Sequence, residues 1–344
     1  MRANLAARLD GLVPLDACSK LETSLDRLHR WTSSLPSNSC FYQNQRPTIF
    51  GQPYQFLSAK RVETALPQIF FDLHSALAGF CLTRGWRADQ LAEGLIHSLS
   101  TWNISLAASA ARSLVETAAS FAIETGAIAD QWSEARSTVP ARLDDALAMR
   151  TGLFQLVLDG MWSTRIQSFL EVAPRLQRKN VLTFIKKSEK RFGQVGLSER
   201  YEVLCDAVHP SFGSAECFWE EVGVREDRPG YGQKRPRQLR VLLNKRAVGK
   251  WGEEIKGSEL PRVIFECSSW GLDRLDSDLR RLEVLCRDVS LTCRIYELAE
   301  LDYWGVAKPS GKYDPCACGS GLKTRLCRHE FGCPPSSPEG AEDT

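Results

Sequence analysis

The feature that most constrains the fold is a run of apolar residues near the C-terminal end, whose spacing alternates between four and three. These residues are Leu275, Leu279, Leu282, Cys286, Val289, Cys293 and Tyr296. Because an α-helix has about 3.6 residues per turn, this spacing places all of them along one seam of a single helix. The pattern predicts a helix over residues 274–300 whose seam packs in a core made of other helices.

Further segments show the same helical rhythm. Residues 63–83 are apolar at helical spacing, and Gly85 predicts the end of that helix. Asn103 is a suitable N-cap for a second long helix over residues 104–125, which Gly126 is expected to end. Shorter helices are predicted over residues 141–158, 179–192 and 197–208. The expected fold class is mainly α, a helical bundle domain followed by a small C-terminal zinc knuckle.

Other segments depart from the helical pattern. Residues 32–56 contain three prolines and are predicted to be loop. Residues 222–262 mix glycine, proline and charge, and within them 238–243 and 262–265 are candidates for short strands. The tail after Pro334 is rich in proline, serine, glycine and acidic residues, which is typical of disorder. The predicted organisation is a helical domain over 1–303, a linker over 304–312, a zinc-binding module over 313–333 and a disordered tail over 334–344.

The composition is typical of a soluble globular protein, with 25% of the 344 residues charged and 43% hydrophobic. The net charge is only +2, so any affinity for nucleic acid must come from a local patch. No apolar run is long enough for a signal peptide or a membrane span, and a cytoplasmic location is expected. In that reducing compartment the twelve cysteines are not expected to form disulfides.

Four of these cysteines fall within 18 residues at the C-terminal end, and the chain there has the layout of a zinc knuckle. Two close cysteines, Cys316 and Cys318, are followed by a glycine-containing turn and then by Cys327 and His329. Zinc prefers four sulfur or nitrogen ligands in a tetrahedron, and glycines let the backbone wrap past the thiolates. So short a segment has no core of its own, so metal binding would supply folding free energy on the order of 10 kcal/mol.

The segment 313–329 resembles the SEC-C motif, which is best known from the C-terminus of the SecA preprotein translocase motor and is appended to many other bacterial proteins. The resemblance rests on Pro-Cys-x-Cys-Gly-Ser-Gly, a following basic residue and the position of the third cysteine. It implies zinc binding by Cys316, Cys318 and Cys327. The family usually places the fourth ligand directly after the third cysteine, where Arg328 stands here. His329 is therefore the expected fourth ligand, with Cys333 as the alternative.

The resemblance does not extend to the motor, because the sequence contains no P-loop signature. In the family the module serves as an adaptor that contacts protein partners or nucleic acid, and the basic residues beside the metal fit either use. A second basic stretch, from Arg225 to Lys256, carries ten Lys and Arg against four acidic residues, a net charge of +6. It is either a solvated loop or a footprint for phosphates. Candidate contacts are Lys234, Arg235, Arg237, Arg240, Lys245, Arg246, Lys323 and Arg325.

Two charges stand out in the otherwise apolar and small-residue stretch 107–119. Arg112 and Glu116 lie four residues apart on one helix face, where they form either a structural salt bridge or part of a polar cleft. His209 precedes Pro210, which predicts that its helix ends there. This histidine either caps the helix or acts as a general acid or base.

These residues weakly resemble a group of uncharacterised bacterial helical proteins with an Arg-x-x-x-Glu helix and a later helix ending in Tyr-x-x-x-(Ser/Cys)-x-x-x-His. Some related bundles are HEPN-type, metal-independent ribonucleases. That likeness implies that His209 acts on the 2′-hydroxyl or the leaving oxygen, that Arg112 stabilises the phosphate charge and that Glu116 orients Arg112. The usual HEPN spacing of four to six residues between Arg and His is absent, since Arg200 precedes His209 by nine.

Three functions are therefore compatible with the sequence. The first is a zinc-containing adaptor for a protein or nucleic-acid partner, and the second is a ribonuclease built on Arg112 and His209. The third is a structural scaffold without a ligand. Binding of nucleic acid without cleavage would favour the adaptor, and cleavage that depends on His209 would favour the enzyme. The sequence determines neither the partner nor the oligomeric state.

Overall fold

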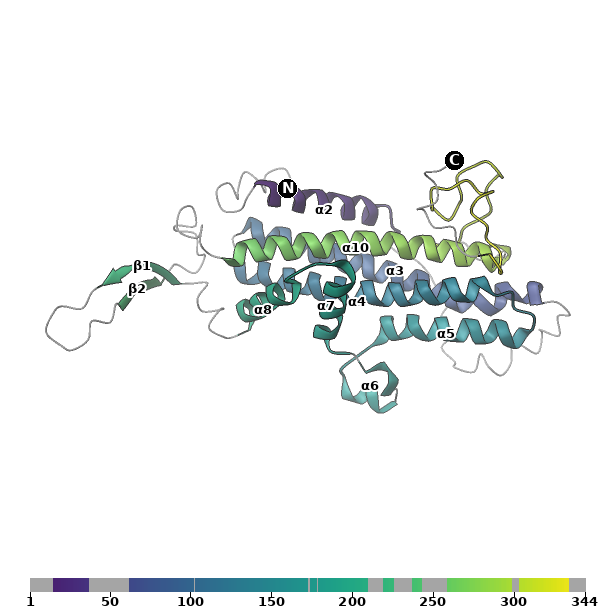
Figure 1. The fold of residues 1–344 in the computed structure, drawn as a ribbon, viewed down its shortest axis with the longest axis horizontal. Helices are drawn as coiled ribbons and strands as arrows, with labels where there is room; N and C mark the ends of the chain where they lie inside the picture. Colours follow the sequence, from purple (N-terminus) through teal and green to yellow (C-terminus); the bar gives the residue numbers. More distant parts are fainter. Residues whose placement is uncertain are drawn as a thin grey trace. The chain divides into compact units, whose positions relative to one another are not determined.

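The computed structural model describes residues 15–36, 62–101, 103–172, 174–177, 179–209, 219–225, 237–242, 259–298 and 303–333. The fold is mainly α, as predicted (Figure 1). Contacts divide the chain into two compact units, of which the first holds residues 1–30, 88–119 and 181–274 and the second holds 31–87, 120–180 and 275–344. The long helices α3 (Val62–Ser100), α4 (Ile104–Ser137) and α10 (Glu259–Thr292) each contribute residues to both units.

The first unit is built from α2 (Leu15–Ser33), the adjoining parts of the long helices, α7 (Val181–Phe192) and α8 (Leu197–Val208). Gly271 of α10 allows a close approach of this helix to α4. A Cβ added to Gly271 of α10 would lie 3.2 Å from the Cβ and 3.3 Å from the backbone carbonyl carbon of Leu114. The N-terminal end of α4 is capped as predicted, because the side-chain oxygen of Asn103 accepts a hydrogen bond from the Leu106 amide at 3.2 Å.

The second unit contains α5 (Leu143–Trp162), α6 (Gln167–Val172) and two 3-10 turns, η3 (Pro174–Leu176) and η5 (Ile295–Glu297). The predicted seam of α10 is confirmed. Its members from Leu275 to Cys293 are buried in this unit, and Tyr296 is partly buried in η5. The same unit buries large apolar side chains of α3 and α4, among them Phe70, Phe80, Phe121 and Trp132.

Two predicted helix ends are wrong, because α3 runs through Gly85 and α4 runs through Gly126. A Cβ on Gly85 would lie 2.5 Å from the indole ring of Trp31, so the glycine makes room for a neighbouring aromatic residue. One glycine inside a helix costs about 1 kcal/mol relative to alanine, which packing of a 39-residue helix outweighs. Residues 262–265 are also helical rather than strand, because they lie within α10, where Val263, Ile264 and Phe265 are buried and Arg262 is exposed.

The other strand prediction is confirmed for 238–242. Strand β2 (Arg237–Leu242) pairs antiparallel with β1 (Trp219–Arg225), with Arg237 opposite Arg225 and Arg240 opposite Glu221. The rest of the basic stretch, including Lys234, Arg235, Lys245 and Arg246, lies outside the described residues. So do residues 37–56 of the predicted loop, and residues 334–344, predicted to be a disordered tail.

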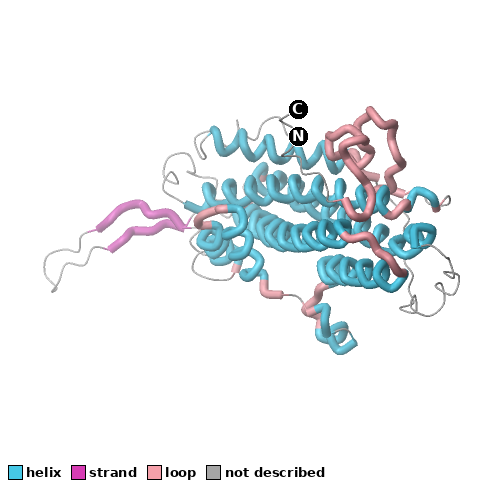
Figure 2. The backbone as a smooth tube through the Cα atoms, turned by 45° about the vertical axis from the view of Figure 1, so that its right-hand side comes forward, coloured by secondary structure: helices cyan, strands magenta, loops and turns pink. Residues whose placement is uncertain are grey.

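Residues 303–333 form turns and loops without a helix (Figure 2). The first residues of this segment are hydrogen-bonded to helices of the second unit. Nε2 of His74 lies 3.1 Å from the carbonyl oxygen of Gly305, and the hydroxyl of Ser290 accepts from the Ala307 amide at 3.1 Å. The predicted linker 304–312 therefore packs against α3 and α10, while its boundaries stay a prediction.

Among the described residues, one helix is long and apolar enough to cross a membrane by composition. This helix is α3, and 72% of its most apolar window is buried inside the structure. Such burial is equally typical of the core helix of a helical bundle, so α3 gives no clear indication of a membrane span.

Candidate metal centre

Four potential metal ligands converge in the C-terminal segment. The ligand atoms of Cys316, Cys318, Cys327 and His329 all lie within 4.8 Å of one another. The sulfurs of Cys318 and Cys327 are 3.5 Å apart, and Sγ of Cys316 is 2.8 Å from Nε2 of His329. Zn–S bonds of about 2.3 Å separate two sulfurs of a tetrahedral site by about 3.8 Å. The cluster therefore has the dimensions and the donor atoms to hold a metal ion.

The first pair of ligands is shaped by a tight turn. The carbonyl oxygen of Cys316 accepts from the Gly319 amide at 3.0 Å. Gly319 and Gly321 have φ values of 83° and 79°, in the left-handed region that side chains disfavour. The Cys316 amide donates to the Leu322 carbonyl at 2.8 Å, which closes the turn. The predicted role of these glycines is therefore confirmed.

A second turn returns the chain to the first pair. The Lys323 carbonyl accepts from the amides of Leu326 and Cys327, at 2.9 and 3.1 Å. All three clustered cysteines are buried, and they pack with Leu291 and Ala307 in a small apolar cluster. Cys333 lies outside the group of four ligand atoms, so the structure brings together His329 rather than the alternative ligand.

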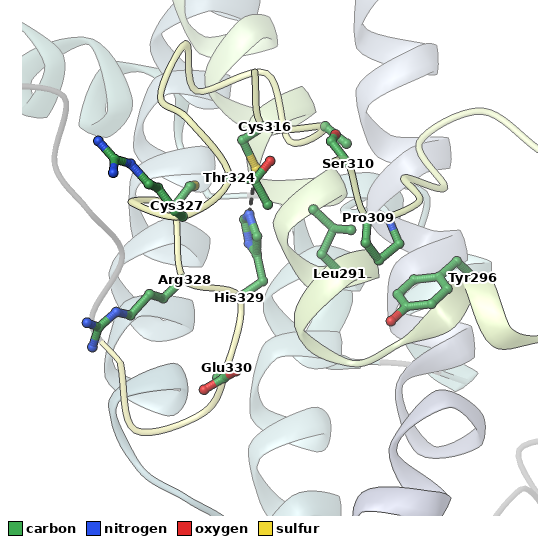
Figure 3. A pocket seen from close by; sticks show the side chains of 12 residues that line it. Leu291, Tyr296, Pro309, Ser310, Cys316, Thr324, Cys327, Arg328, His329 and Glu330 are labelled. Atoms are coloured by element: carbon green, nitrogen blue, oxygen red, sulfur yellow. Dashed lines mark hydrogen bonds between the residues drawn. The ribbon is translucent and has the colours of Figure 1, made fainter. Parts of the chain in front are cut away.

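The imidazole of His329 is oriented by a carboxylate of α10. Nδ1 of His329 lies 2.5 Å from Oδ1 of Asp288, so the other ring nitrogen faces Cys316 (Figure 3). The second carboxylate oxygen of Asp288 accepts from Nε1 of Trp132 at 2.7 Å and from Nη1 of Arg136 at 3.0 Å. Sequence reasoning missed these three residues, because no local pattern marks a partner 41 positions from the ligand.

Hydrogen bonds within the cluster shift the proton affinities of its members. The hydrogen bond from Cys318, with further contributions from His329 and Ser320, lowers the pKa of Cys327 to about 3. Burial acts to lower the pKa of His329, but hydrogen bonds to Asp288 and to the two facing cysteines raise it to about 10. A metal needs thiolates and a neutral imidazole, so binding at this site would release protons.

A pocket of about 420 Å³ adjoins the cluster. Its lining includes Cys316, Cys327 and His329 on one side and Leu291 and Tyr296 on the other (Figure 3). Three of the four potential ligands therefore line this pocket.

A second polar cluster lies within the first unit and joins α4 to α8. Nε of Arg112 donates to Oε1 of Glu116 at 2.9 Å, and Nη1 of Arg112 lies 3.1 Å from Nε2 of His209. The hydroxyl of Tyr201 donates to the same Glu116 oxygen at 2.7 Å. Burial, followed by this hydrogen bond, raises the pKa of Tyr201, so the phenol stays protonated. Arg112 and His209, predicted as candidates for one site, are thus adjacent, and Tyr201 is an additional member.

Comparison of the chain with protein-family models, curated proteins and solved structures found no match. The class that the fold and site define is a mainly helical protein with a Cys3His cluster that could bind a metal ion. The resemblance to the SEC-C motif rests on the residues of the motif alone.

Proposed function

We propose that this chain is a zinc-binding adaptor, in which one zinc ion shapes the C-terminal segment and the surface around it binds a nucleic-acid partner. The convergence of the four donor atoms within 4.8 Å carries this proposal. Three thiolates and one imidazole are a donor set that suits zinc, and four protein ligands are typical of structural sites. Such an ion would hold the turns at Gly319 and Lys323 in place.

The surface next to the cluster supports a nucleic-acid partner. Tyr313 is 65% exposed, and the charged groups of Lys312 and Arg325 lie 5.8 and 5.5 Å from the centre of its ring. Lys323 and Arg328 are also exposed, alongside the acidic Asp314 and Glu330. An exposed aromatic ring between cations can stack on a base while the cations contact phosphates.

The test is RNA binding by the full-length chain, measured by fluorescence anisotropy with a labelled single-stranded oligonucleotide at several salt concentrations. We expect the affinity to fall steeply with salt, and removal of zinc by EDTA to weaken binding. The double variant Lys323→Ala/Arg325→Ala should reduce the salt slope by about two. A matched control is Lys186→Ala/Lys187→Ala, which removes two exposed charges of α7.

Binding that is insensitive to salt, or an equal loss in both double variants, would contradict the nucleic-acid surface. A protein that holds zinc but binds no RNA would leave a protein partner or a purely structural role. Zinc content, measured by inductively coupled plasma mass spectrometry, tests the metal independently of the partner.

A second candidate function is RNA cleavage at the Arg112 cluster, favoured by the 3.1 Å approach of Arg112 to His209. Since the guanidinium only donates, this contact is a hydrogen bond in the tautomer of His209 that carries its proton on Nδ1 and leaves Nε2 to accept. A neutral imidazole can take a proton from a 2′-hydroxyl, and Arg112 would stabilise charge on the phosphate. Glu116 and Tyr201 would hold Arg112 in position.

The cleavage assay compares the wild type with His209→Ala in excess EDTA, which suppresses metal-dependent contaminants. The matched control is His97→Ala, which changes an exposed histidine of α3. Cleavage lost in the first variant and kept in the second would establish the enzyme. If the wild-type protein does not cleave RNA, the adaptor is the proposal that remains.

A further inference from the structure

Asp288 connects the metal ligands to the helical body of the second unit. Its carboxylate is buried, and the two oxygens contact different residues. Oδ1 lies 2.5 Å from Nδ1 of His329, whereas Oδ2 accepts from Trp132 and Arg136 of α4. One side chain of α10 thus contacts both the C-terminal segment and a neighbouring helix.

The surroundings explain why a carboxylate is tolerated at this buried position. Arg136 is only 2% exposed, and its guanidinium offsets the charge of Asp288 at 3.0 Å. A zinc ion with three thiolates would carry a net negative charge, so this arginine also offsets charge near the metal. A carboxylate that accepts the Nδ1 proton fixes the imidazole tautomer that leaves Nε2 free for the metal.

Two more contacts join the end of the C-terminal segment to α3 and α4. The Gly332 amide donates to the carbonyl oxygen of Arg136 at 2.7 Å. The ring of Phe331 packs against the rings of both Phe70 and Trp132, with centroid distances of 6.0 and 6.1 Å. The Phe331 ring and the Gly332 amide therefore contact α3 and α4, while Glu330 and Gly332 stay exposed to solvent.

We infer that Asp288 is a positioning residue of the metal centre, and that metal binding locks the C-terminal segment onto α4 and α10. The inference rests on the proposed zinc site. It implies that the helical body and the metal stabilise each other: the helices preorganise the fourth ligand, and the bound ion holds the segment against the helices. The C-terminal module is then an integral part of the second unit.

The test is the zinc affinity of the full-length protein with Asp288→Asn, measured by competition with a chromophoric chelator. Loss of such a partner weakens metal binding by about 10- to 100-fold. The matched control is Asp276→Asn, a buried carboxylate of the same helix that is paired with Arg280 at 3.0 Å. We expect the control to bind zinc as the wild type does.

Since Asp288→Asn also leaves Arg136 without its carboxylate, Trp132→Phe provides a second variant that keeps the charge pair. It removes one hydrogen bond to Asp288 and should weaken zinc binding by less than Asp288→Asn does. In the cobalt-substituted protein, a changed d–d absorption band in Asp288→Asn would report altered ligand geometry, which a general loss of stability would not produce.

Amide hydrogen exchange tests whether metal binding holds the C-terminal segment against α4 and α10. Removal of the metal from the wild type should raise the exchange rate of the Gly332 amide at least several-fold. Equal zinc affinity in the wild type, Asp288→Asn and Asp276→Asn, or a Gly332 amide unaffected by the metal, would overturn the inference. A wild type that binds no zinc would instead refute the proposed metal site on which the inference rests.

Discussion

Nη1 of Arg112 lies 3.1 Å from Nε2 of His209, although 97 positions separate the two residues. The same guanidinium is held by Glu116, which also accepts the hydrogen bond of Tyr201. The side chains of Arg112, Glu116 and Tyr201 and of His209, the C-cap residue of α8, therefore form one continuous hydrogen-bonded chain that ends at an exposed histidine. This arrangement connects two segments that the sequence singles out separately.

Replacing Tyr201 with phenylalanine should destabilise the protein by about 1 kcal/mol, because the part-buried Glu116 carboxylate loses one of its donors. Urea unfolding measures the free energy change. A double-mutant cycle with Glu116→Gln should give a coupling energy of about 0.5 kcal/mol or more. Strictly additive effects would show that the hydroxyl and the carboxylate do not interact in solution.

The identity of the fourth ligand can be tested by zinc content. We expect His329→Ala and Cys318→Ser to lose the bound ion and Cys333→Ser to keep it, because only the first two residues belong to the cluster. Chelation of the wild type should lower the free energy of unfolding by about 4 kcal/mol if free zinc stood 1,000-fold above the Kd. Retention of zinc by His329→Ala would assign the fourth position to another residue.

His74 should make the stability depend on acid pH. Burial lowers the pKa of this side chain to about 4, although hydrogen bonds with Gly305 and Cys286 oppose the shift. The unfolded chain, with a histidine pKa near 6.5, therefore binds the proton more readily than the folded chain. Stability is complete above pH of about 6.5 and declines as the pH falls toward 4, by roughly 3 kcal/mol in total.

The measurement is urea unfolding between pH 7 and pH 4, with EDTA present so that metal loss does not contribute. His74→Phe should show a smaller decline over this range than the wild type does. An identical pH dependence in both proteins would assign the effect to other groups.

Gly85→Ala should destabilise the protein by about 1–3 kcal/mol, because the added Cβ would lie 2.5 Å from the Trp31 ring. Gly94→Ala is the matched control on the same helix, since no atom lies within 4 Å of its added Cβ. The control should stabilise the protein by about 0.5–1 kcal/mol through helix propensity. Thermal unfolding of the two variants should therefore shift in opposite directions.

The helices were predictable where the local pattern is strong. The seam from Leu275 to Cys293 repeats at helical spacing, and Asn103 carries a capping side chain, so both signals are contained in neighbouring residues. The helix end predicted at Gly85 is wrong because this glycine makes room for the ring of Trp31, which is 54 positions away in the sequence. The apolar run at 262–265 misleads because a short run has no period that separates strand from helix.

The sequence by itself predicts Cys316, Cys318 and Cys327 as ligands, because they lie close together in the chain and are joined by turns that glycine permits. The fourth position stayed open between His329 and Cys333, and the structure brings His329 to the cluster. Tertiary structure alone decided which groups surround that set and which distant residues share a site. Asp288 reaches His329 because the C-terminal segment folds back onto α10, and Arg112 reaches His209 because the end of α8 packs against α4. Local spacing determines the turns and the helix faces, whereas long-range hydrogen bonds depend on how those faces pack.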